Sequence, residues 1–203
     1  MQNGSWVELR NTTGTFSTGV SDYYTLTITR RTSASGNVNS LLDWTKDNPP
    51  LKNYCYCRLF KNCISLTQAP ELPATKLASG CYISMFYMCT SLVQAPKLPA
   101  TTLDSSCYNS MFQGCTSLTQ APELSATKLA SGCYSLMFSG CSKIDHILWK
   151  SRTIPLSTYC NGWLGGVSAS GTFEYTWPLL DVASIARTTS GVPEGWNMQQ
   201  LKP

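Results

Sequence analysis

The sequence predicts a repeat solenoid, in which 26-residue coils stack between β-rich N- and C-terminal caps. The block CYCRLFKNC at positions 55–63 returns as CYISMFYMC at 81–89, CYNSMFQGC at 107–115 and CYSLMFSGC at 133–141, so the period is constant. The intervening segments are also alike, reading ISLTQAPELPATKLASG, TSLVQAPKLPATTLDSS and TSLTQAPELSATKLASG. Strict periodicity of this length is typical of proteins whose units bury a face only against their neighbours.

Each coil is expected to be leucine-rich-repeat-like, because the unit is too short for a propeller blade or a pair of helices. Such a coil combines one short strand with a compact return. The expected strands are Leu66–Leu72, Leu92–Leu98 and Leu118–Leu124. Proline cannot donate to a β-ladder, so the strands must be short or irregular at Pro70, Pro96 and Pro122. The return segment CYxxMF spaces Tyr82, Met85 and Phe86 as one helical or 3₁₀ turn would.

The chain is expected to be one continuous domain in three segments. Residues 1–50 form an N-terminal β-rich cap or docking segment, with a strand at Tyr23–Arg31 because YYTLTITRR alternates and is rich in β-formers. Residues 51–160 form the solenoid, with full repeats at 63–88, 89–114 and 115–140. Residues 161–203 form the C-terminal cap, where large aromatic side chains can cover the last coil: Trp163, Phe173, Trp177 and Trp196.

Composition excludes several classes of partner. The net charge is +4, charged residues make up 13% of the chain, and no basic stripe is present to follow a phosphate backbone. No stretch approaches the ~20 apolar residues of a membrane span, and residues 1–30 contain no apolar run typical of a signal peptide. We therefore expect no nucleic-acid partner and no membrane span.

Eight of the ten cysteines fall into two columns of the repeat. Metal binding needs ligands that converge, whereas columns spread along the stack at ~5 Å per coil. Cysteine is also a small residue that is often buried. Buried thiols are therefore favoured over disulfides, and disulfides over a metal site. The predicted core columns are Cys55, Cys81, Cys107 and Cys133; Cys63, Cys89, Cys115 and Cys141; and Phe60, Phe86, Phe112 and Phe138.

No catalytic constellation is visible in the sequence. A hydrolase with a histidine base would have to use His146, which is the only histidine and is adjacent to Asp145. A structural or exposed histidine is the favoured interpretation. The sequence thus predicts no catalytic residue, no metal ligand, no cofactor and no enzyme.

The candidate binding surface consists of side chains that recur on the expected strands or vary on the returns. Gln68, Gln94 and Gln120 predict a row of amides, which can bind a sugar or peptide but are more readily expected to bond one another and the backbone. Glu71, Lys97 and Glu123 predict an exposed column of alternating charge, in which each pair contributes well under ~1 kcal/mol. Tyr87 and Met88 are a candidate contact spot, with a packing role equally open.

The unit CYxxMFxxCTSLxxAPxLPATxLA resembles the BspA-type leucine-rich repeat proteins, especially a cysteine-rich variant of gut Bacteroides and their phages. Three further motifs support the likeness over residues 36–196: an entry segment GNVNSLL at residues 36–42, WL at 163–164 followed by GTF at 171–173, and SGVPEGW at 190–196. The resemblance implies a non-enzymatic binding or adhesion module on a virion or cell surface. Its implied partners are a host surface protein or glycan and, through the N-terminal segment, other virion proteins. A purely structural virion decoration or spacer is the alternative.

Overall fold

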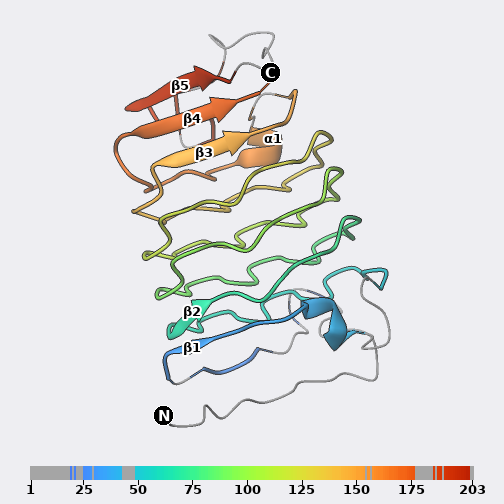
Figure 1. Cartoon of the computed structure of the whole chain (residues 1–203). Coiled ribbons are helices and arrows are strands. Elements are labelled where there is room, and N and C mark those ends of the chain that lie inside the picture. Colours follow the sequence, from blue (N-terminus) through green and yellow to red (C-terminus); the bar gives the residue numbers. More distant parts are fainter. Residues whose placement is uncertain are drawn as a thin grey trace.

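A computed structural model describes residues 19, 21, 25–28, 30–42, 49–153, 155, 157–176, 185, 187–188 and 190–201. The strands are β1 (Thr32–Ser33), β2 (Leu66–Gln68), β3 (His146–Trp149), β4 (Gly171–Tyr175) and β5 (Trp196–Gln200). The helices are the 3₁₀ helix η1 (Val38–Leu41) and the one-turn α1 (Ser157–Cys160). β1 and β2 form one parallel pair, and β3, β4 and β5 form a second parallel sheet in that order (Figure 1).

The predicted leucine-rich-repeat-like solenoid is wrong. Regular structure in the described residues is limited to a few short parallel strands in two small sheets, with almost no helix. The expected strand at Leu66–Leu72 is shortened to β2. Those at Leu92–Leu98 and Leu118–Leu124 are replaced by single bridges, Gln94 to Gln120 and Leu124 to Trp149. The prolines supply the reason, since Pro70, Pro73, Pro96, Pro99 and Pro122 all lack the N–H that a ladder needs.

The returns are chains of tight turns and not helical or 3₁₀ segments. Successive N–H groups alternate between two kinds of acceptor. Those of Cys81, Ile83 and Met85 bond the carbonyl three residues back. Those of Tyr82, Ser84 and Phe86 bond the carbonyls of Cys107, Asn109 and Met111, which lie one unit further along the chain. A helix directs every N–H along its own axis, so this alternation prevents one from forming.

Left-handed backbone at every fourth position also breaks helical continuity in the returns. Ser84 and Met88 have φ of 51° and 58°, and Ser106 and Ser110 both have φ of 53°. Right-handed helices require negative φ, and the left-handed region costs non-glycine residues about 1–2 kcal/mol each. The CYxxMF spacing correctly predicts that the Cys, Tyr, Met and Phe side chains are buried. The same spacing fits a helical turn and this turn pattern equally well.

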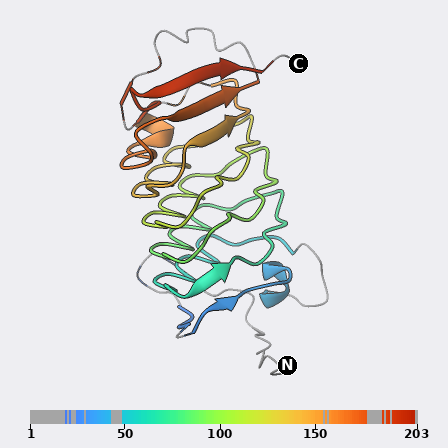
Figure 2. The ribbon, with the colours of Figure 1, turned by 60° about the vertical axis from the view of Figure 1, so that its left-hand side comes forward.

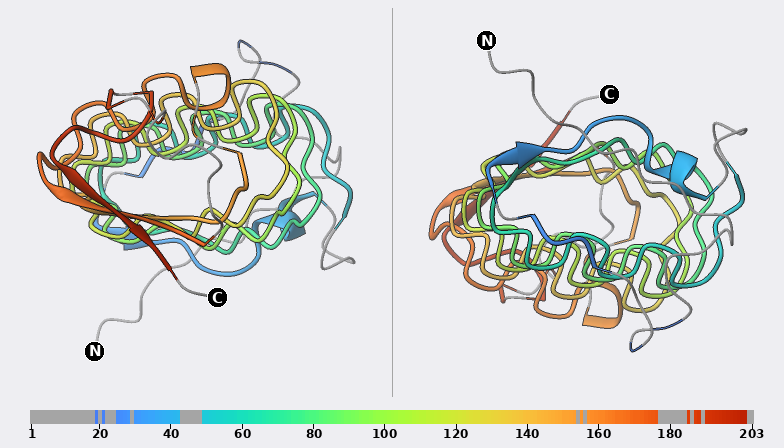
Figure 3. Two further views of the ribbon diagram at one scale, coloured as in Figure 1. Left: turned by 90° about the horizontal axis from the view of Figure 1, so that it is seen from above. Right: turned by 90° about the horizontal axis from the view of Figure 1, so that it is seen from below.

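The turns and the strands occupy opposite sides of the molecule. Seen from above, the turns follow one long side of a flattened ring and β1–β5 follow the other (Figure 3). We call the surface of residues 79–88, 105–114 and 131–140 the turn face. The surface of residues 66–72, 92–98 and 118–124 together with β3–β5 is the extended face. Figure 2 shows β1 and β2 near one end of the molecule and β3–β5 at the other.

The core lies between these two faces and is closed at one end by aromatic side chains. Trp149, Trp163 and Phe173 are fully buried and contact one another, with ring centroids 5.5–6.4 Å apart. A spacing close to that of the repeat continues here, because Ile147 pairs with Phe173 and Phe173 with Met198. Of the expected cap aromatics, Trp196 is also buried, while Trp177 lies outside the described residues.

At the N-terminal end, the described part of the strand expected at Tyr23–Arg31 is not a strand, and residues 23, 24 and 29 lie outside the described residues. Residues 25–28 and 30–31 have no strand pairing, and β1 begins one residue later, at Thr32. Most of the rest of segment 1–50 lies outside the described residues. The described part contains η1, capped by Asn37, whose side chain accepts a hydrogen bond from Asn39 N at 2.7 Å.

Candidate functional site

Three exposed glutamines form a row on the extended face. Gln68 lies in β2, and Gln94 and Gln120 are joined by a backbone bridge. Within the described part of the chain, none of the three amide side chains makes a hydrogen bond. The expectation that the amides bond one another or the backbone is therefore not met there, and both the N–H donors and the carbonyl acceptor of each amide face solvent.

The charged column beside the glutamines is also exposed at Glu71, Lys97 and Glu123. It gains a fourth member, because Lys150 Nζ lies 2.5 Å from Glu123 Oε1. The Lys150 hydrogen bond, with a second from Ser125, lowers the pKa of the Glu123 carboxyl. Lys150 follows β3, where the sequence motif has ended, so periodicity alone could not identify it.

A second row of polar residues crosses the second sheet, which the sequence motif did not predict. His146 pairs with Thr172 across β3 and β4, and Thr172 pairs with Asn197 of β5. His146 Nε2 lies 2.9 Å from Glu174 Oε2, and the histidine side chain is 51% exposed. The histidine is thus a surface residue beside a carboxylate, in keeping with the exposed interpretation. A signal for these residues was available in the alternation of HILW and GTFEY.

Tyr87 and Met88 do not belong to the same surface as the glutamines. Both lie on the turn face, where Lys61 Nζ lies 5.5 Å above the Tyr87 ring. Met88 is 38% exposed and lies over Gly114, at which an added Cβ would overlap its sulfur. The candidate binding residues therefore divide between two opposite faces.

The cysteines of both columns are buried free thiols. In the second column the thiols bond backward along the chain: Cys89 Sγ donates to Phe60 O at 3.0 Å and Cys115 Sγ to Phe86 O at 3.1 Å. Cys141 Sγ repeats the contact with Phe112 O at 3.0 Å. Each of these carbonyls also accepts a backbone N–H, so the thiol occupies its second lone pair. The hydrogen bond to a main-chain carbonyl therefore accounts for the cysteine at this position of each unit, without a catalytic or metal-binding role.

Aromatic rings stack along the core in two columns. Phe86 and Phe112 have ring centroids 5.6 Å apart, and Phe112 and Phe138 are 5.8 Å apart, with interplanar angles of 3°. Phe60 stacks on Phe86 at 5.4 Å. A parallel column of tyrosines, which was not among the predicted core columns, consists of Tyr56, Tyr82, Tyr108 and Tyr134. Its signal was present in the repeated CY pair.

Burial of the thiols predicts a loss of stability at alkaline pH. Burial raises the pKa of Cys63 and Cys133 to about 11, and of Cys55 and Cys141 to about 12. Unfolded thiols ionise near ~8.5. The stabilising contribution is complete below that pH and is lost as pH rises toward the folded values, because the unfolded chain then binds fewer protons.

Denaturation under reducing conditions at pH ~7, ~9 and ~10 measures this effect. The free energy of unfolding should be lower at each step above pH ~8.5, and thiolate absorbance should appear only with unfolding. Equal stability at all three pH values, or thiolate in the folded chain at pH ~9, would contradict the burial argument.

Among the described residues, no group of three or more His, Cys, Asp or Glu side chains is arranged to hold a metal ion. The same part of the chain contains no helix that is long and apolar enough to cross a membrane.

In comparisons with known proteins, no family model, no curated protein and no solved structure matches this chain. The resemblance to BspA-type proteins therefore stays a prediction from the sequence motifs.

Proposed function

We propose that the chain is a non-enzymatic, surface-displayed binding or adhesion module of a phage virion or bacterial surface, which contacts a host surface protein or glycan. The observation that supports this most strongly is the row of exposed amides at Gln68, Gln94 and Gln120, which make no side-chain hydrogen bond in the described part of the chain. Amides without internal partners are available to a ligand.

The chemistry of the extended face favours a polar, weakly charged ligand. An amide both donates and accepts hydrogen bonds, as do peptide groups and sugar hydroxyls. Neighbouring strands lie ~4.8 Å apart, so amides on successive units can contact successive groups of an extended ligand. The adjacent column alternates in sign, and Glu123 is already paired with Lys150, so long-range attraction of a highly charged partner is not expected.

Binding of the labelled purified chain to gut-bacterial cells tests this proposal. The cells are used intact, after glycan removal and after protease treatment, so that a glycan is distinguished from a protein partner. Replacing Gln94 and Gln120 together by alanine should weaken binding to intact cells at least about fivefold, because two hydrogen bonds are lost.

Gln113→Ala is the matched control, because Gln113 lies on the turn face and carries the same amide. It should leave binding unchanged. No binding to intact cells would overturn the adhesion proposal in favour of a structural virion role. A Gln113→Ala effect as large as that of the double variant would overturn the assignment to the extended face.

A further inference from the structure

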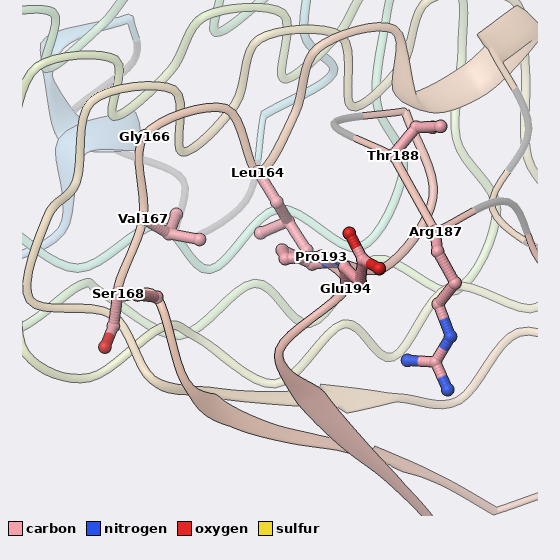
Figure 4. A pocket seen from close by; sticks show the side chains of 9 residues that line it. Leu164, Gly166, Val167, Ser168, Arg187, Thr188, Pro193 and Glu194 are labelled. Carbon is pink, nitrogen blue, oxygen red and sulfur yellow. The ribbon is translucent and has the colours of Figure 1, made fainter.

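A shallow hollow of about 270 Å³ lies near the C-terminal end of the described chain (Figure 4). Its first wall consists of residues 164 and 166–169, and its second wall of residues 187–188 and 193–194. Its apolar lining comes from Leu164, Val167 and Pro193, and its polar lining includes Arg187 and Glu194. These residues belong to or adjoin the closing motifs WL and SGVPEGW, which the proposed function leaves without a role.

Two tryptophans hold the opposite walls of the hollow together. Trp163 Nε1 extends from the first wall and donates to Gly191 O, between the two parts of the second, at 2.7 Å. Trp196 Nε1 follows the second wall and donates to Ser168 O of the first at 2.9 Å. Both indole rings are buried. Reciprocal bonds of this kind fix the width of the hollow before a ligand arrives, which lowers the entropic cost of binding.

The two charged side chains of the hollow remain available to a ligand. Arg187 Nη1 donates to Trp196 O at 2.9 Å, which anchors the guanidinium and leaves its other N–H groups unoccupied by the described residues. Glu194 is exposed and makes no hydrogen bond or ion pair within the described residues. The hollow therefore combines a fixed donor, a free acceptor and an apolar lining.

We propose that this hollow binds a single hexopyranose unit, which deepens the proposed function and rests on it. Sugar hydroxyls satisfy the arginine donors and the glutamate acceptor at once, while the C–H face of the ring covers the apolar lining. Ligand pockets usually measure ~300–1,000 Å³, so a hollow of this size suits one sugar unit and not an oligosaccharide. A small zwitterion could also pair with the guanidinium and the carboxylate; the glycan partner of the proposed function is the reason for choosing a sugar, and the test includes free amino acids as the competing ligand.

The test uses the full chain and a panel of methyl hexopyranosides that includes N-acetylated members. Saturation-transfer NMR should detect at least one glycoside. In spectra of the isotope-labelled chain, the same glycoside should shift the signals of lining residues such as Val167, Ala169 and Thr188 and leave those of the extended face unchanged. Glu194→Ala should weaken that binding at least about tenfold, because a charge-assisted hydrogen bond is lost. Glu71→Ala removes another exposed carboxylate, on the extended face, and should leave the glycoside affinity unchanged.

Three results would overturn the sugar site. In the first, no glycoside of the panel binds. In the second, free amino acids bind in place of the glycosides. In the third, Glu71→Ala loses glycoside binding and Glu194→Ala keeps it. If no glycoside binds but Glu194→Ala still adheres to intact cells, the sugar site is rejected and the proposed function stands.

Discussion

Replacing Gly171 by alanine is expected to lower the free energy of unfolding by about 3 kcal/mol. A Cβ at this position would overlap the carbonyl oxygen of Asp145 and would lie 2.8 Å from its carbonyl carbon and 2.7 Å from a ring carbon of Trp196. The obstructing carbonyl belongs to the main chain immediately before β3, so it cannot move away as a flexible side chain would. The β3–β4 pairing must then shift, and with it the closing end of the core.

Urea denaturation of the variant measures this effect, and Ser170→Ala is its control. Ser170 is the exposed neighbour of Gly171 and already carries a Cβ, so the control should change stability by less than ~0.5 kcal/mol. A Gly171→Ala variant as stable as the parent would show that β4 does not approach Asp145 so closely.

Replacing Phe112 by alanine is expected to cost about 3–5 kcal/mol of unfolding free energy. Its ring is fully buried and stacks on both Phe86 and Phe138, so the variant loses apolar burial and two aromatic contacts and leaves a cavity. Phe60→Ala removes a ring that, among the described residues, stacks on Phe86 alone and is slightly exposed. It should therefore cost less. An equal loss of unfolding free energy in Phe112→Ala and Phe60→Ala would contradict the idea that each stacked ring adds to stability.

The repeat spacing is a good guide to side-chain neighbours and a poor guide to secondary structure. Residues that share a position in the unit, such as Phe86 and Phe112, lie next to each other because each unit bonds the next through its main chain. The same spacing is compatible with a strand and helical return or with chains of turns. The positive φ angles of Ser84 and Met88 are compatible only with the turns. Serine and methionine rarely adopt a positive φ, so the sequence does not predict it at these positions.

The candidate site was only partly accessible to sequence reasoning for a related reason. Gln68, Gln94 and Gln120 recur in the motif and could be recognised as a row, but whether the amides bond one another depends on side-chain directions that spacing does not specify. Glu174 and Asn197 join the same face only because β3, β4 and β5 pair in parallel after the motif has ended. Lys150 lies beside Glu123 because its own N–H bonds Leu124 O. Tyr87 and Met88 separate from the glutamines because the chain reverses between the return and the extended segment.

The role of the extended face as the contact surface can be measured by lysine acylation of the chain while it is bound to intact cells, compared with the free chain. Lys97 lies beside the glutamine row on the extended face, whereas Lys61 lies on the opposite side, next to Tyr87 of the turn face. If the extended face is the contact surface, binding should protect Lys97 and leave the labelling of Lys61 unchanged. Protection of Lys61 with full labelling of Lys97 would contradict the assignment of binding to the extended face.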